Sequence, residues 1–212
     1  MTNFNYGKLT TSLIAVWFVV SLAASALHIF KTDPGRPPLA FGIAALGPIV
    51  VFLLWFATSE QFREFALGLN PLTLTLVHAW RVVGIVFLVL YTYGILPGMF
   101  ALPAGWGDIA IGATAPLVAM KLVTPDHKKG FILWQVLGIS DLVIAVFLGT
   151  TAALFNPHGI ATSAMNVLPM SLIPTFVVPL LLILHVICIA QARRWHAHPY
   201  SGIGGQLPVS AA

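Results

Sequence analysis

The chain has 212 residues, of which 58% are hydrophobic and only 8% are charged. A soluble domain carries about 25% charged residues, so this composition excludes a soluble protein, and the mean hydropathy of +0.95 indicates helices that cross a lipid bilayer. The net charge is +4, but the ten basic residues are scattered along the chain, which argues against a nucleic-acid-binding protein.

Six segments reach the roughly 20 mostly apolar residues that a membrane-spanning helix needs. The predicted spans are 9–30, 39–58, 72–94, 103–122, 131–152 and 170–192. Turn-forming residues separate them, such as the stretch 33–38 after the first span and Asn70-Pro71 at the start of the third. We therefore predict an all-α integral membrane protein, with one transmembrane domain over residues 1–212 and a flexible cytoplasmic tail at 195–212.

The first span has an alternative interpretation. Lys8, the apolar run after it and Ala24-Ser25-Ala26 resemble a signal peptide with its cleavage site. The apolar run is long for a signal peptide, so we expect the segment to remain as a span.

The distribution of basic residues predicts the orientation. With the N-terminus inside, the inner segments hold seven of the ten basic residues and the outer loops hold two. The inner seven are Lys8, Arg63, Lys121, Lys128, Lys129, Arg193 and Arg194. The positive-inside rule then places both termini in the cytoplasm, and we expect a bacterial-type inner membrane.

Two connecting segments are unusual. Segment 59–70 has apolar residues on one helical face and polar residues on the other, which predicts a short helix in the inner interface, with a simple turn as the alternative. Its apolar positions are Phe62, Phe65, Ala66 and Leu69, and its polar positions are Glu60, Gln61, Arg63 and Glu64. Segment 96–107 links two spans without any charge. One interpretation is irregular backbone that dips into the membrane, which is tolerated only where it is buried in protein or faces a cavity.

Three charged residues lie within the predicted spans: Arg81, Asp108 and Asp141. A charge at the centre of a span costs about 2.5–3.5 kcal/mol, so each must face the interior and find a partner. At 1.5 Å per residue, Arg81 and Asp141 lie about 13 and 15 Å from the inner boundary, and His185 and His78 lie about 12 and 9 Å from it. The sequence thus predicts one polar layer, with Asp108 as its outer wall or as a separate site.

Both aspartates have small residues around them at the same spacing. Gly105-xx-Asp108-xxx-Gly112 recurs 33 residues later as Gly138-xx-Asp141-xxx-Ala145. Small residues at this spacing let helices approach closely, so each aspartate is expected on a packed face. An inverted repeat of the kind found in transporters is one interpretation, and chance similarity between two helices rich in small residues is the simpler one.

Three classes of function, beside a purely structural Arg81–Asp141 pair, remain open. The first is a carrier or channel for a proton, an ion or an unidentified small solute, with Asp141 as the proton-sensitive acid, Arg81 as counter-charge or anion ligand, and His78 and His185 as relays. The second is a b-type haem protein with His78 and His185 as axial ligands. The third is an intramembrane enzyme acting on a lipid, quinone or isoprenoid, with Asp108 or Asp141 as acid or base.

The expected partner is the lipid bilayer, and assembly into a homo-oligomer is left open. No metal-binding motif is present, and Cys188 is the single cysteine, so we expect neither a metal site nor an internal disulfide.

Overall fold

The computed structural model describes residues 5–31, 39–155 and 160–195, and within these ranges the chain is helical without any strand. The predicted loop at 33–38 and the predicted tail after Trp195 lie outside the described residues. The elements in chain order are α1 (Tyr6–Ala26), α2 (Leu39–Thr58), α3 (Glu60–Leu67), α4 (Pro71–Val77), η1 (His78–Gly84), α5 (Ile85–Thr92), α6 (Gly98–Lys121), η2 (Pro125–His127), α7 (Lys128–Phe155), η3 (Ser163–Asn166), η4 (Ile173–Val177) and α8 (Val178–Arg194).

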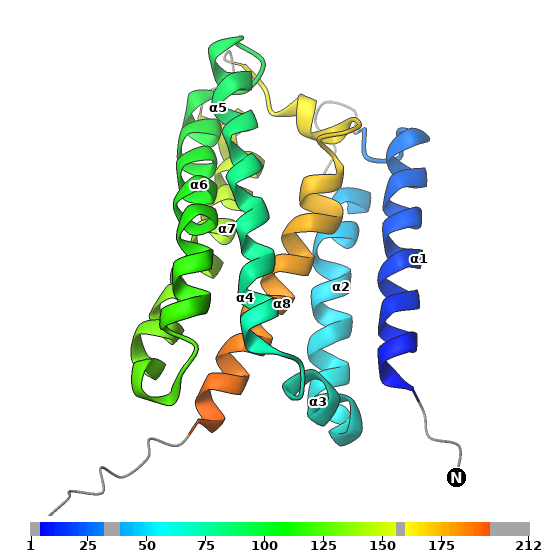
Figure 1. Cartoon of the computed structure of the whole chain (residues 1–212). Helices are drawn as coiled ribbons and strands as arrows, with labels where there is room; N and C mark the ends of the chain where they lie inside the picture. Colours follow the sequence, from blue (N-terminus) through cyan, green and yellow to red (C-terminus); the bar gives the residue numbers. More distant parts are fainter. Residues whose placement is uncertain (1–4, 32–38, 156–159, 196–212) are drawn as a thin grey trace, which may run out of the picture.

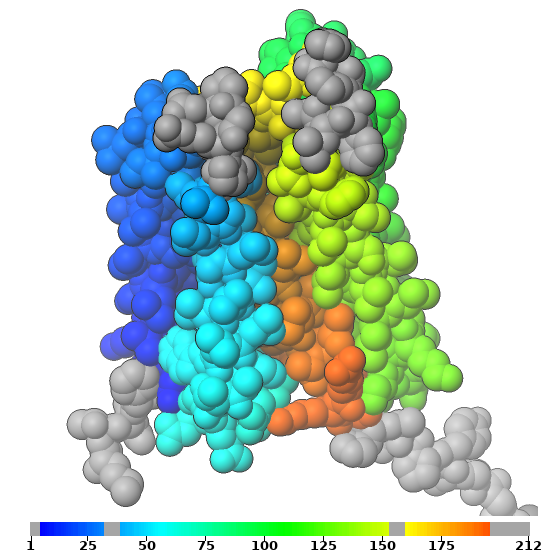
Figure 2. Space-filling model, turned by 180° about the vertical axis from the view of Figure 1, so that it is seen from behind, coloured from blue at the N-terminus to red at the C-terminus, as the bar shows by residue number. Residues whose placement is uncertain are grey.

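The long helices run side by side and form one bundle (Figure 1). α1 begins and α8 ends at the same end of the bundle, which is also where α3 lies; we call this the α3 end. Seen from behind, α8 lies between α2 and α7 (Figure 2). The stretch containing η4 and α8 is the most buried of the apolar helices, so the last span forms the centre of the fold.

Five helical stretches among the described residues are long and apolar enough to cross a membrane. They are Tyr6–Ala26, Leu39–Thr58, Pro71–Thr92, Pro125–Ala152 and Ile173–Arg194. α6 is not one of them, although it has 24 residues. Its glycines, its two internal prolines and Asp108 make it less apolar than its neighbours.

The third span is not one regular helix. It consists of α4, the 3-10 segment η1 and α5, so the backbone tightens over His78–Gly84. A 3-10 segment in the middle of a helix often marks a functional or strained position. Asn70 begins the span as predicted, because its side-chain oxygen accepts hydrogen bonds from the amides of Leu72 and Thr73 at 2.9 and 3.3 Å.

The interpretation of 96–107 as irregular backbone is wrong. α6 begins at Gly98 and continues through Pro103, so most of this segment is the first part of a helix. The turn between α5 and α6 is complete before the helix begins. Gly94, with φ +67°, closes the turn after α5, and Pro97, in extended backbone, precedes the first turn of α6.

α8 is held near both of its ends. At the end away from α3, η4 is a π-helical segment whose Thr175 carbonyl accepts hydrogen bonds from Trp17 Nε1 at 3.1 Å and Ser21 Oγ at 3.4 Å, both on α1. At the α3 end, Gln191 Nε2 donates to the carbonyls of Leu67 and Leu69 at 3.1 and 2.7 Å. Together these bonds connect the last span to the first span and to the α3–α4 connection.

α3 forms as a helix with the predicted faces. The Ser59 side chain caps it by accepting from the Phe62 amide at 3.3 Å, and the Phe62 ring stacks on Trp55 with ring centroids 3.9 Å apart. On the outer face Glu64 and Arg194 form an exposed ion pair of 3.0 Å. The hydrogen bonds from Arg194 lower the pKa of Glu64 below its usual value.

Gly112 lets η1 approach α6 closely. A Cβ atom at Gly112 would lie 2.9 Å from the backbone carbon of Arg81 and 2.5 Å from the amide nitrogen of Val82. Backbone atoms in two packed helices cannot move aside as a flexible side chain can. The close approach of the two helices therefore depends on the absence of a side chain here.

We expect Gly112→Ala to lower the free energy of unfolding by about 1–3 kcal/mol, the usual cost of overpacking. Titration of the purified protein in maltoside with SDS, followed by circular dichroism, measures the change. Gly47→Ala is the matched control, because a Cβ there would meet no atom within 4 Å. Equal stability of the two variants would contradict the close approach.

Candidate functional site

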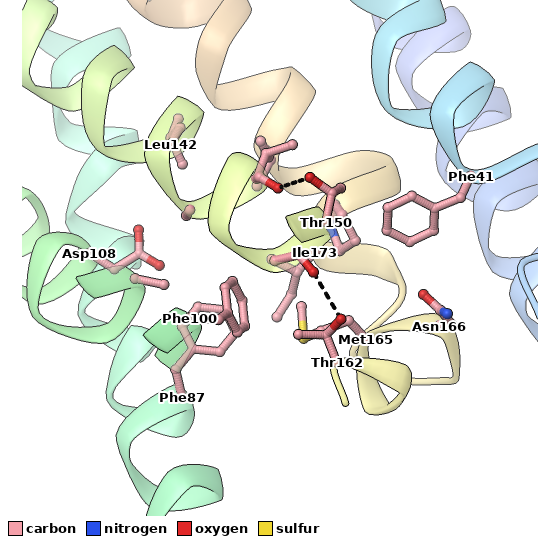
Figure 3. Close-up of a pocket in the computed structure, with 16 residues that line it drawn as sticks. Phe41, Phe87, Phe100, Asp108, Leu142, Thr150, Thr162, Met165, Asn166 and Ile173 are labelled. Carbon is pink, nitrogen blue, oxygen red and sulfur yellow. Dashed lines mark hydrogen bonds between the residues drawn. The ribbon is translucent and has the colours of Figure 1, made fainter. Parts of the chain in front are cut away.

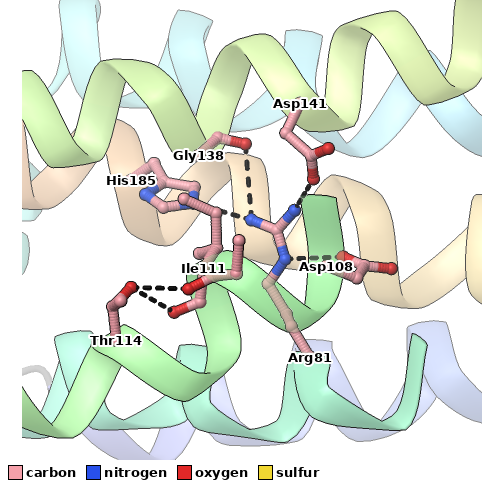
Figure 4. A network of polar contacts seen from close by, with 8 residues as sticks. Arg81, Asp108, Ile111, Thr114, Gly138, Asp141 and His185 are labelled. Atoms are coloured by element: carbon pink, nitrogen blue, oxygen red, sulfur yellow. Dashed lines mark hydrogen bonds and ion pairs between the residues drawn. The ribbon is translucent and has the colours of Figure 1, made fainter. Parts of the chain in front are cut away.

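Arg81 lies at the centre of the bundle and binds two carboxylates at once (Figure 4). Its Nε donates to Asp108 Oδ1 at 2.7 Å and its Nη2 donates to Asp141 Oδ2. Its Nη1 donates to the carbonyl oxygen of Gly138 at 3.3 Å. Arg81 comes from η1, Asp108 from α6 and Asp141 from α7, so one guanidinium joins three helices. We call these three residues the arginine cluster.

The 3-10 geometry of η1 explains how Arg81 and His78 reach the same region. Side chains three residues apart are eclipsed in a 3-10 helix, whereas they diverge slightly in an α-helix. His78 is fully buried and Arg81 is 3% exposed. The local tightening therefore directs both polar side chains of the third span into the interior.

Glycines on neighbouring helices provide the space for the polar side chains. At three positions a Cβ atom would collide with a site residue on the facing helix. The pairs are Gly84 with Asp108, Gly107 with Asp141, and Gly138 with His185. Of these glycines only Gly138 belongs to the small-residue pattern of the sequence analysis, and Gly84 and Gly107 leave the space for the two aspartates.

His185 connects the arginine cluster to a second polar group. Its Nδ1 lies 2.5 Å from Gln135 Oε1, and its Nε2 lies 3.5 Å from Arg81 Nη1. An amide oxygen can only accept, so Nδ1 carries the proton and Nε2 presents its lone pair to Arg81. His185 and Gln135 are both fully buried.

His78 stacks on His185, with ring centroids 3.8 Å apart and an interplanar angle of 19°. Among the described residues, neither ring nitrogen of His78 has a hydrogen-bond partner, and neither does Gln135 Nε2. A buried polar group without a partner costs about 1–3 kcal/mol. His78, His185 and Gln135 therefore form a buried polar group with hydrogen-bonding capacity to spare, which we call the histidine pair with Gln135.

The stacked arrangement does not have the geometry of axial haem ligands. Two axial ligands point ring nitrogens at the iron from opposite faces of the porphyrin. The faces of His78 and His185 lie too close for a macrocycle between them. The two rings would have to separate before they could hold a haem.

Two cavities meet at Asp108. The first, of about 180 Å³, is lined by Phe41, Phe87 and Phe100 and reaches towards the end opposite α3; we call it the phenylalanine cavity. The second, of about 280 Å³, is lined by Arg81 and Trp80, and we call it the arginine cavity. Asp108 lines both, so this carboxylate is within reach from two sides.

The charges of the arginine cluster do not balance. One guanidinium faces two carboxylates, which leaves one negative charge in excess when both acids are ionised. The side chain of Arg81 is only 1% exposed, whereas those of Asp108 and Asp141 are each 17% exposed. Asp108 Oδ2 and Asp141 Oδ1 accept no hydrogen bond from the described residues, so each acid keeps a free oxygen.

The five residues singled out from the sequence lie together. Arg81 contacts Asp108, Asp141 and His185, and His185 stacks on His78. The open question about Asp108 is answered in favour of a shared site, because it binds the same guanidinium as Asp141.

Gln135 and the three phenylalanines of the first cavity were not identified from the sequence. Gln135 could have been found, because it is a polar residue in an apolar span, three positions before Gly138. The phenylalanines give no such signal, since aromatic residues are common throughout the spans.

We expect Arg81→Met to destabilise the protein by about 3–5 kcal/mol, because it leaves two carboxylates buried without their cation. Thermal unfolding in detergent checks this. Adding Asp108→Asn and Asp141→Asn to Arg81→Met is expected to restore most of the loss. Arg194→Met, in the exposed pair with Glu64, is the control and should change stability little. An equal effect of both arginine substitutions would contradict the buried pairing.

Comparison with known proteins gives one family. No curated protein and no solved structure matches the chain. A family model described as "Domain of unknown function (DUF8737)" matches residues 37–193. This range begins just before α2, ends within α8 and includes every residue of the site, whereas α1 lies before it. Because the match covers more than half of the chain, the protein belongs to the DUF8737 family.

Proposed function

We propose that the protein is a small membrane carrier that moves a proton, or a small solute together with a proton, through the arginine cluster. The observation that carries this proposal is the ratio of two partly exposed carboxylates to one buried guanidinium. A pair that only fastens two helices needs one acid and no access to a cavity. A second acid beside a cavity provides a place where a proton or another cation can bind and leave.

Asp141 is the proton-accepting group in this proposal, and Arg81 is its counter-charge. When Asp141 binds a proton, Arg81 remains paired with Asp108, so the guanidinium is not left without a partner. This lowers the cost of changing the charge of one acid in a medium where an unpaired charge is expensive. The second aspartate thus supports a cycle of proton binding and release.

The histidine pair with Gln135 is the proposed relay on the other side of Arg81. His185 lies within 3.5 Å of the guanidinium and hydrogen bonds to Gln135. His78 adds two ring nitrogens that have no partner in the part of the chain that the structure describes. Chains of ionisable and polar groups across a bundle are typical of proton paths in membrane proteins. The relay continues the path from the cavities at Asp108 towards the α3 end.

The carrier has six spans in this proposal, with α6 as the sixth. α6 has 24 residues, runs along the bundle in Figure 1 and packs against α5 and α7. Asp108 lowers its hydropathy, but that carboxylate faces Arg81 and not lipid. With six crossings, the start of α1 and the end of α8 lie on the same side of the membrane. The positive-inside rule assigns this side, the α3 end, to the cytoplasm, with α3 in the membrane interface.

Cysteine labelling tests this topology. We expect Tyr93→Cys, 76% exposed after α5, to react with a membrane-impermeant maleimide on intact cells. Lys129→Cys, at the start of α7, should react only after permeabilisation. The wild type is the control, because its single cysteine, Cys188, is fully buried. If both positions react from the same side, α6 does not cross the membrane.

Proton flux tests the function. Proteoliposomes loaded with pyranine and given a potassium diffusion potential should change internal pH faster than protein-free vesicles. Asp141→Asn is expected to reduce the rate at least tenfold, towards that of empty vesicles, because an amide does not bind the proton. Asp126→Asn, an exposed acid in η2, is the matched control and should behave like the wild type. Equal rates for Asp141→Asn and wild type would remove Asp141 from the path.

A further inference from the structure

We propose that the phenylalanine cavity binds a small alkylammonium ion, with Asp108 as its counter-charge. The inference deepens, and rests on, the proposed carrier function, because it names the solute class that this side of the arginine cluster takes. The observations that carry it are the aromatic lining, the direction of the hydrogen bonds at the polar lining residues, and the free oxygen of Asp108.

Aromatic rings from three helices surround this cavity. Phe41 comes from α2, Phe87 from α5 and Phe100 from α6. Phe87 and Phe100 meet edge to face, with ring centroids 5.4 Å apart and an interplanar angle of 67°. The face of an aromatic ring attracts a cation, and groups of such rings recognise quaternary ammonium ligands.

The carboxylate lies beside these rings. Phe100, Ala104 and Asp108 follow one another at four-residue spacing on α6, so they share one face of the helix, and all three line the cavity. Figure 3 shows Asp108 next to Phe100 and Phe87, with Phe41 on the opposite side. Asp108 Oδ1 accepts from Arg81, which leaves Oδ2 for a ligand.

The hydroxyl groups of the cavity can only accept hydrogen bonds from a ligand. Thr150 Oγ1 donates its proton to the carbonyl of Val146 at 2.9 Å, and Thr162 Oγ1 donates to the carbonyl of Gly149 at 2.9 Å. Each hydroxyl has one proton, so both oxygens present only lone pairs to the cavity. Figure 3 shows these two bonds as dashed lines.

This lining selects the charge of the ligand. It combines ring faces, a carboxylate oxygen and two acceptor oxygens, all of which favour positive charge. No lysine, arginine or histidine is among the described residues that line it, so an anion would find no cationic partner there; the side-chain amide of Asn166 is neutral and can donate as well as accept. The volume of about 180 Å³ fits a small ion, and the excess negative charge of the arginine cluster provides long-range attraction.

Isothermal titration calorimetry of the purified full-length protein in maltoside tests the proposal, with choline as the probe. Its uncharged isostere, 3,3-dimethylbutan-1-ol, has the same shape without the charge. We expect saturable binding of choline and at least tenfold weaker binding of the isostere. Equal binding of both compounds, or no saturable binding of choline, would overturn the proposal; equal binding would show a merely apolar cavity such as one that takes an acyl chain.

Two variants locate the site. Phe100→Leu keeps an apolar side chain but removes the ring face, and it should weaken choline binding about fivefold to thirtyfold. Phe147→Leu is the matched control, because Phe147 is 56% exposed on α7 and does not line the cavity. Asp108→Asn should abolish binding, with circular dichroism as the check that it folds. If Phe100→Leu binds choline like Phe147→Leu, the cavity is not the site.

The choline-binding experiment and the proton-flux experiment have independent outcomes. Choline binding without proton flux would leave the alkylammonium site in place and remove the carrier function. Proton flux without choline binding would support the carrier function and overturn the alkylammonium site.

Discussion

The fold is organised around one buried guanidinium. Arg81 is nearly inaccessible, and in a lipid environment its charge has to be neutralised within the bundle. Two carboxylates and one carbonyl from two other helices do this. This requirement explains other features: the 3-10 segment directs the arginine inwards, and glycines on the facing helices make room for its partners. The third span is therefore irregular where the charge lies and regular elsewhere.

Much of the architecture follows from the sequence, because membrane spans obey simple rules. Apolar length identified the five stretches that the structure shows as long and apolar, and Asn70-Pro71 marked a helix start. The cost of burying charge identified Arg81, Asp108 and Asp141 as interior residues. A single sequence does not show which acid binds which oxygen or nitrogen, since the exact crossing of the helices decides that. The mutual arrangement of His78 and His185 was undetermined for the same reason: similar depth allows both a stack and a pair of axial ligands.

The error at residues 96–107 has a specific physical cause. In a soluble protein, two prolines and several glycines within twelve residues would indicate a loop. Here α6 continues through Pro103 and packs against α5 and α7. In a membrane, unsatisfied backbone groups are so costly that a helix with a proline is better than an irregular segment. The phenylalanine cavity could not be predicted either, because Phe41 on α2 is far in the chain from Phe87 and Phe100 on α5 and α6. Only the i, i+4, i+8 spacing of Phe100, Ala104 and Asp108 was visible in advance.

The attachment of α8 at both ends has a mechanical consequence. A helix that is hydrogen bonded near both of its ends can bend in the middle but cannot shift along its axis without breaking those bonds. Thr175 is held by α1 near one end of the last span, and Gln191 is held by the α3–α4 connection near the other. His185 lies on α8 between these two hydrogen-bonded positions. A motion of α8 that separates His185 from Arg81 would therefore have to be a lateral bend of the helix. The hydrogen bonds at Thr175 and Gln191 would limit how far it bends.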